Sequence, residues 1–154
     1  MKKPLLISAC LLGIPCRYDG QTKKGVFGRD ALPLEDFLPK LEEKYTLVPY
    51  CPEIYGGLPT PRIPSERVGD EVIAKNGARV TDEYFRGASH GLSLCQTLHI
   101  DIALTKAKSP ACGKGRIYDG THTGTLTDGN GVLVDALLSA GILVYNEDEA
   151  DSLL

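Results

Sequence analysis

The sequence lacks the features that mark several large classes of protein. No apolar run approaches the roughly 20 residues that a membrane-spanning helix needs, so no membrane partner is expected. Lysine and arginine (17) nearly balance aspartate and glutamate (20), which leaves a net charge of only −3. A dedicated nucleic-acid binder usually carries a strong basic excess. We therefore expect no stable nucleic-acid binding, although this charge is compatible with a small nucleoside-like substrate.

Linkers, internal repeats and low-complexity tracts are also missing. The 154 residues fit one domain, and a chain of this length builds a full core without covalent staples. We therefore predict a single domain over residues 1–154. The apolar stretch within residues 1–10 is too short for a signal peptide and leads into polar loop sequence rather than a cleavage site. We expect a cytoplasmic protein whose first strand lies there.

The five cysteines include no closely spaced pair. There is no C-x₂-C knuckle, and the three histidines form no recognisable zinc motif with the cysteines. A disulfide framework is not expected either, because the number of cysteines is odd and no export signal is present. The thiols are therefore inert core residues, catalytic groups or ligands of a metal centre.

What the sequence does contain is an alternation of short apolar strands and amphipathic helices. Residues 71–80 add a hairpin signal with Asn76-Gly77 as a type I′ turn, Thr81 is typical of a helix cap, and residues 115–131 are typical of a loop. This order predicts a three-layer α/β fold of the Rossmann or flavodoxin-like type, with a mainly parallel four-stranded sheet, helices on both faces and a small β-hairpin insertion. The predicted strands are 5–8, 45–49, 100–104 and 142–145, and the predicted helices are 31–44, a long helix from residue 81, and 132–140.

Three cysteines, Cys10, Cys51 and Cys112, lie a few residues beyond the carboxyl end of a predicted strand. The carboxyl ends of parallel strands gather at one edge of a sheet, so we expect these thiols to converge there. Thiolates select zinc or iron–sulfur clusters, and the absence of a zinc knuckle favours a cluster. If only three thiolates hold the cluster, one iron is left open and can act as a Lewis acid. Cys95 fits a core position in a helix, whereas Cys16 is compatible with a ligand, a catalytic thiol or neither.

Polar residues near these cysteines are candidates for proton transfer and substrate binding. Glu53 follows one of the loop cysteines by two positions and is either a turn-capping carboxylate or a general acid/base. Ser109 either accepts hydrogen bonds from backbone amides or binds a substrate oxygen. Asp19 begins an Asp-Gly turn. Arg62 and Glu66 follow a proline-rich loop and are candidates for an ion pair.

The candidate residues fall into four ordered motifs: Ser8-Ala9-Cys10-Leu11-Leu12-Gly13, then Cys16-Arg17-Tyr18-Asp19-Gly20, then Cys51-Pro52-Glu53 with Gly56-Gly57-Leu58 and Pro61-Arg62, and finally Lys108-Ser109-Pro110-Ala111-Cys112-Gly113. Together these motifs resemble the thiouracil desulfidase family, and the likeness covers essentially the whole chain. One departure is Ala111, where many relatives have a second serine.

This resemblance implies a cofactor, a reaction and roles for site residues. The reaction is a non-redox desulfuration of a thiolated pyrimidine such as 2-thiouracil, in which an open iron takes the sulfur, C=O replaces C=S and hydrosulfide is released. Glu53 matches the acid/base carboxylate and Ser109 the substrate-side serine, while Cys16 and Asp19 lie in a shared motif and are further catalytic candidates. The implied ligands of the [4Fe–4S] cluster, whose fourth iron stays open, are Cys10, Cys51 and Cys112.

Three alternatives stay open from the sequence. In the first, the substrate is a thiolated nucleoside or tRNA-derived thiouridine instead of a free base. In the second, the protein is a hydrolase or transferase with Cys16 or Cys51 as nucleophile and Glu53 as base. In the third, it is not an enzyme but a binding module stabilised by zinc or a cluster. The partners expected for a desulfidase are a small thiolated pyrimidine and the iron–sulfur assembly machinery. The sequence does not predict the oligomeric state.

Overall fold

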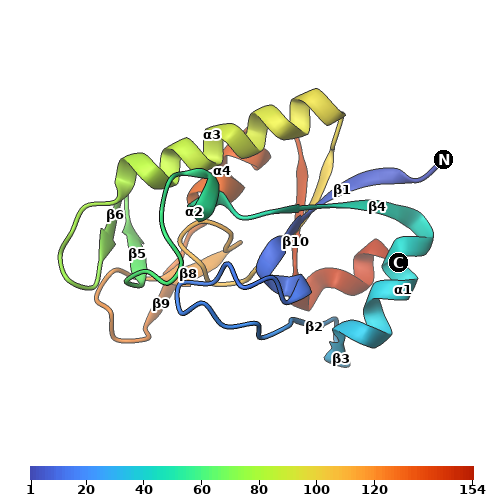
Figure 1. The fold of residues 1–154 in the computed structure, drawn as a ribbon, viewed down its shortest axis with the longest axis horizontal. Coiled ribbons are helices and arrows are strands. Elements are labelled where there is room, and N and C mark those ends of the chain that lie inside the picture. Colours follow the sequence, from blue (N-terminus) through green and yellow to red (C-terminus); the bar gives the residue numbers. More distant parts are fainter.

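The computed structural model describes residues 1–154 and has a four-stranded parallel sheet at its centre (Figure 1). The strand order is β10-β7-β1-β4, so the first strand lies inside the sheet and the last strand at one edge. The predicted parallel α/β sheet is therefore confirmed. Its strands are β1 (Lys3–Ser8), β4 (Tyr45–Tyr50), β7 (Ile102–Thr105) and β10 (Leu143–Asn146).

Helices cover both faces of this sheet, as the sequence predicted (Figure 1). Alternate residues of a strand point to opposite faces, and accordingly Leu6 packs in the core cluster of one face while Leu5 and Ile7 pack in the other. None of the helices is both long and apolar enough to span a membrane. The first face carries α3 (Thr81–Leu98) and α4 (Val132–Ser139), and the second carries α1 (Leu34–Lys44) and the short 3₁₀ helix η2 (Glu147–Leu153).

The start of two helices differs from the prediction. Helix α1 begins only at Leu34, because Leu32–Pro33 forms the strand β3, which pairs with β2 (Val26–Phe27). Thr81 does not cap α3. Its buried hydroxyl accepts a hydrogen bond from the backbone N–H of Val72 at 2.9 Å and so attaches the helix to the neighbouring hairpin.

The hairpin insertion exists, but its strand pairing differs from the prediction. Strand β6 (Glu71–Ala74) pairs with the preceding segment β5 (Ser65–Val68), and the turn at Asn76-Gly77 leads only to a single bridge between Ile73 and Arg79. The sequence analysis missed β5 because the strand has only four residues and half of them are charged.

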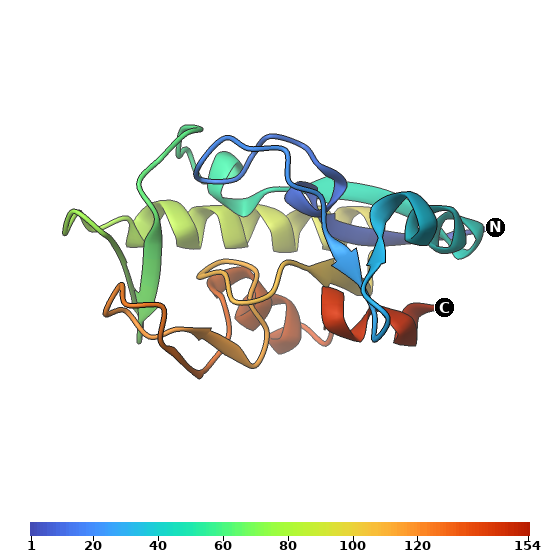
Figure 2. The ribbon, with the colours of Figure 1, turned by 90° about the horizontal axis from the view of Figure 1, so that it is seen from below.

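A second hairpin lies where a loop was predicted. Strands β8 (Arg116–Tyr118) and β9 (Leu126–Asp128) pair over three residues each. Figures 1 and 2 place the two hairpins beside each other at one end of the molecule, beyond the carboxyl ends of β1 and β4. Strands this short carry almost no periodic signal, so residues 115–131 are not recognisable as a hairpin from their sequence.

Candidate functional site

A cavity of about 500 Å³ opens at the carboxyl edge of the sheet. The structure brings the three strand-end cysteines into its lining, as the predicted topology required, and adds Cys16 to them. Cys95 instead lies buried in α3 among core residues, as predicted. Glu53 and Ser109 also line the cavity, whereas Asp19 does not.

The ends of three strands place the cysteines. Cys10 lies in the 3₁₀ helix η1 (Ala9–Leu12), directly after β1, and Cys51 directly follows β4 as the N-cap of the short helix α2 (Pro52–Tyr55). Cys112 lies on the loop after β7. The backbone N–H of Lys106, which begins this loop, donates to the Ser8 hydroxyl at 3.0 Å and so ties the end of β7 to the end of β1.

Mutual hydrogen bonds and burial raise the pKa of Cys16, Cys51 and Cys112. The hydrogen bond with Cys10 is the main cause that raises the pKa of Cys16, to about 11. The hydrogen bond with Cys16, followed by burial, raises the pKa of Cys51, and burial raises the pKa of Cys112. A nucleophilic cysteine needs a lowered pKa, so the alternative with Cys16 or Cys51 as nucleophile has no support from the site.

The three strand-end cysteines fit the ligands of an iron–sulfur cluster. Cys10, Cys51 and Cys112 bring their thiols to one cavity from three separate segments of the chain. No three His, Cys, Asp or Glu side chains lie close enough to hold a single metal ion, whereas a structural zinc site gathers four ligands tightly around one point. Ligands that surround a space suit a cluster, because its irons occupy separate corners.

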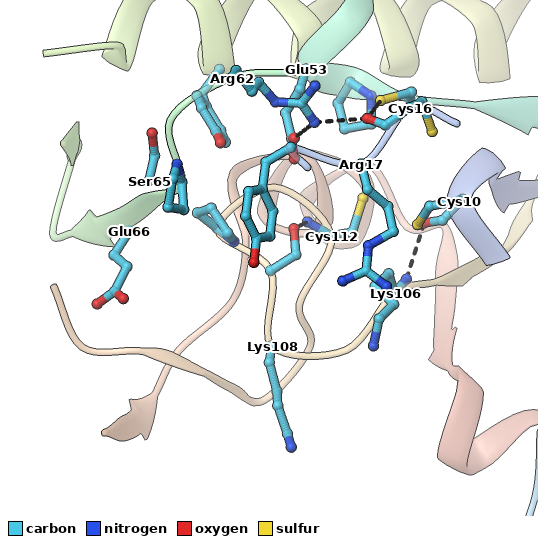
Figure 3. A pocket seen from close by; sticks show the side chains of 18 of the residues that line it. Cys10, Cys16, Arg17, Glu53, Arg62, Ser65, Glu66, Lys106, Lys108 and Cys112 are labelled. Carbon is cyan, nitrogen blue, oxygen red and sulfur yellow. Dashed lines mark hydrogen bonds and ion pairs between the residues drawn. The ribbon is translucent and has the colours of Figure 1, made fainter. Parts of the chain in front are cut away.

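Glu53 enters the cavity from α2 and forms an ion pair with Arg62 (Figure 3). The side chains are 15% and 6% exposed, respectively. Burial opposes the charge of Arg62, but the adjacent Glu53 carboxylate outweighs it, so the pKa of the guanidinium is raised. The pair uses Oε2 of Glu53, and Oε1 has no hydrogen-bond partner in the protein.

The ion pair predicted between Arg62 and Glu66 is therefore wrong. Glu66 lies on β5, at the opposite side of the cavity from Cys10 (Figure 3). Its Oε1 accepts hydrogen bonds from the backbone N–H groups of Gly120 and His122 at 2.9 and 3.1 Å, and its Oε2 lies 3.5 Å from Nδ1 of His122. Glu66 thereby fastens one hairpin to the other.

His122 was not singled out by the sequence analysis. It lines the cavity beside Glu66, has a positive φ of 57°, and its Nε2 is buried without a hydrogen-bond partner. The only sequence signal was its position in a Gly/Thr-rich loop, which does not distinguish it from an ordinary turn residue. One ring nitrogen of the imidazole is thus buried and unpaired at the hairpin end of the cavity.

Ser109 and Asp19 shape the loops that carry cysteines. The Ser109 hydroxyl oxygen accepts hydrogen bonds from the backbone N–H groups of Ala111 and Cys112 at 3.0 and 2.9 Å. Asp19 accepts a hydrogen bond from the backbone N–H of Gln21 at 3.0 Å and lies 3.6 Å from the Arg17 guanidinium, which does line the cavity. The structural alternative for Ser109 is therefore observed, and its hydroxyl proton takes no part in these two bonds.

The fold and the site together define an α/β protein with a thiol-lined cavity at the carboxyl edge of a parallel sheet. A family profile described as 2-thiouracil desulfurase matches residues 5–149, and the chain belongs to this family. The family membership confirms the predicted enzyme class, a desulfidase, and rules against a binding module without activity.

The chain is also similar to two individual proteins over most of its length. A Bacillus subtilis (strain 168) protein named "Uncharacterized protein YbbK" is 32% identical over 160 residues, which cover 97% of this chain and 99% of the relative. A solved structure, the [4Fe-4S]-dependent thiouracil desulfidase TudS, is 43% identical, with a TM-score of 0.86, and the match covers 99% of this chain and 95% of TudS. The second comparison confirms the predicted fold over nearly the whole chain.

Proposed function

We propose that this chain removes sulfur from a thiolated pyrimidine such as 2-thiouracil in a hydrolytic, non-redox reaction. The observation that carries the proposal is one cavity that holds three strand-end thiols and a carboxylate with a free oxygen. The family and the similarity to TudS support the substrate class.

The residues proposed to hold a [4Fe–4S] cluster are Cys10, Cys51 and Cys112. When bound on three thiolates, such a cluster supplies an open, thiophilic iron that acts as a Lewis acid toward the sulfur of the substrate. The five cysteines are all free thiols, which suits a reducing compartment. We propose a cytoplasmic location and loading of the cluster by the iron–sulfur assembly machinery.

Glu53 is the proposed general base. Its Oε2 is held by Arg62, so its unpartnered Oε1 is the atom that takes a proton from the attacking water. The water oxygen forms the new bond to carbon as the carbon–sulfur bond breaks, and the sulfur leaves as hydrosulfide. No electrons are exchanged with an external donor, because water and the thiocarbonyl together balance the products.

Ser109 is proposed to act on the substrate side. Its oxygen accepts two backbone amide hydrogen bonds, which fixes its position, and its hydroxyl proton donates to a substrate oxygen or nitrogen. Cys16 and Asp19 are proposed to contribute through the loop that they shape. The Cys16 carbonyl accepts hydrogen bonds from Arg62 and from the Cys51 thiol, at 2.9 and 3.7 Å.

A second candidate substrate, a thiolated nucleoside, is favoured by the size of the cavity. Its volume of about 500 Å³ lies within the range of pockets that take drug-sized ligands, and the proposed cluster would occupy the part of it next to the cysteines. The hairpin end lies across the cavity from Cys10 (Figure 3) and is the part where a sugar would lie.

Sulfide release from 2-thiouracil and from 4-thiouridine by anaerobically reconstituted protein tests the proposal. We expect repeated turnover, with one hydrosulfide per desulfurated product and no added reductant. The protein without a cluster is the control and should be inactive. A requirement for an electron donor, or full activity of the cluster-free protein, would contradict the proposed reaction.

A further inference from the structure

Arg62 lines the cavity, and its side chain is bound by several other parts of the chain. Its guanidinium is 6% exposed and contacts three separate segments of the chain. Nη2 donates to the Glu53 carboxylate and to the carbonyl of Cys16 at 2.9 Å. Nη1 donates to the carbonyl of Pro59 and to the hydroxyl of Thr60 at 3.2 and 3.1 Å. Four of its five N–H groups are thus committed within the protein.

The backbone of Glu53 is fixed without Arg62. A Cβ atom at Gly87 of α3 would lie 1.8 Å from the carbonyl oxygen of Pro52, and one at Gly56 would lie 2.0 Å from the carbonyl oxygen of Glu83. Helix α2 therefore rests directly on the backbone of α3. These contacts set where the Cα atom of Glu53 lies, but they do not determine where its carboxylate points.

The direction of the Glu53 carboxylate depends on a single partner. Arg62 is the only residue that forms a hydrogen bond with this carboxylate, and it binds Oε2 while Oε1 stays free. The same Nη2 atom also binds the carbonyl of Cys16, to which the Cys51 thiol donates a hydrogen bond at 3.7 Å. One nitrogen of Arg62 thus connects the carboxylate to the loop beside a strand-end cysteine (Figure 3).

We infer that Arg62 is a positioning residue, which orients Glu53 so that its free oxygen faces the water that replaces sulfur. The inference rests on the proposed role of Glu53. Pro59 and Thr60 hold Nη1, so the planar guanidinium directs Nη2 at both acceptors, a geometry that the freely rotating ammonium group of lysine does not reproduce. Because a misplacement of about 1 Å costs on the order of a hundredfold in rate, the loss of this fork acts on turnover more than on substrate binding.

The test compares R62K with R86M in the iron-loaded protein. Arg86 is a matched control, because its Nη1 donates to the carbonyl of Gly56 at 2.8 Å and so holds the end of α2 without touching Glu53. We expect R62K to lower kcat by roughly a hundredfold with KM within about twofold and iron content unchanged, and R86M to keep the kcat of the wild type. Unchanged kcat, or loss of iron in R62K, overturns the inference.

A double-mutant cycle separates positioning from an independent effect. If Arg62 acts through Glu53, E53Q/R62K is no slower than E53Q alone, because coupled residues do not add. Equal losses in both backgrounds overturn the inference. In R62A, guanidinium ions at concentrations that leave the fold intact should restore turnover, whereas in R62A/E53Q they should not. A failure of this rescue also contradicts the inference.

These outcomes are distinct from a failure of the proposed function. If the wild-type protein releases no sulfide, the function is contradicted before any variant is compared. If the wild type is active and R62K is equally active, only the positioning role of Arg62 is lost. A further readout does not depend on activity. Hydrogen exchange over residues 13–20 should accelerate in R62K but not in R86M, because R62K removes the guanidinium bond to the Cys16 carbonyl, whereas the backbone bond from the N–H of residue 62 to the Tyr18 carbonyl is kept in both variants.

Discussion

The two ends of the cavity are built in different ways. The cysteine end is formed by the ends of parallel strands, whose positions follow from the register of the central sheet. The hairpin end is formed by two short antiparallel hairpins, β5–β6 and β8–β9, which are joined through the hydrogen bonds of Glu66. The cysteine end is therefore held rigidly by the sheet, which suits chemistry. The hairpin end depends on a few polar contacts, which suits selection of the substrate.

The largest effect is expected at the cysteine end. Each of the variants C10A, C51A and C112A should lose the cluster, because only three protein thiolates are proposed to hold it. Iron and acid-labile sulfide per chain measure this directly. C95A is the matched control, since Cys95 is buried in α3 away from the cavity, and it should retain the cluster. A full four-iron cluster in C51A would show that the proposed ligand set is wrong.

The next effect separates proton transfer from cluster binding at the same end. E53Q keeps the size of the side chain but removes the base, so kcat should fall by roughly 10² to 10⁴-fold while the iron content stays that of the wild type. Steady-state kinetics of sulfide release measure the change. Undiminished turnover would remove Glu53 from the mechanism.

At the hairpin end, Glu66 is expected to affect stability. In E66A the partly buried N–H groups of Gly120 and His122 lose their acceptor, and each such loss costs up to about 1–3 kcal/mol, the value for a fully buried group. Urea unfolding should therefore show a lower free energy of unfolding, with the cluster retained in the folded protein. E71A, which removes a carboxylate from an exposed ion pair with Arg79, is the control and should change stability by less than about 1 kcal/mol. An equal loss in both variants would contradict the fastening role of Glu66.

The smallest effect is expected at His122 and depends on the substrate. H122N keeps a residue that tolerates the positive φ of this position but removes the unpaired ring nitrogen. If the hairpin end receives the sugar of a nucleoside, kcat/KM for 4-thiouridine should fall by up to about tenfold, the equivalent of one hydrogen bond, while that for 2-thiouracil stays unchanged. Equal losses for both substrates would show that the hairpin end does not select the substrate.

The cysteine end was predictable from the sequence because its signals are local and the topology rules are strong. Buried parallel strands are short continuous apolar runs, and their carboxyl ends share one edge, so Cys10, Cys51 and Cys112 could be placed together before any coordinates. The position of Glu53 beside them followed from its spacing to Cys51, whereas its role in proton transfer is a proposal.

The hairpin end was not predictable, because its strands are three or four residues long and its contacts join distant segments. Glu66 and His122 are 56 residues apart, and nothing in the spacing of either residue indicates the other. The wrong partner predicted for Arg62 has the same cause: the choice between Glu66 and Glu53 depends on the path of the proline-rich loop, which sequence periodicity does not determine.

Hydrolytic removal of sulfur at this cavity is tested most directly by the origin of the new oxygen atom. Reconstituted protein should be given 2-thiouracil in H₂¹⁸O, without oxygen or reductant, and the product analysed by mass spectrometry. The account predicts uracil that carries one ¹⁸O atom for each hydrosulfide released. A product that lacks the label, or a pyrimidine that has lost sulfur without gaining oxygen, would contradict it.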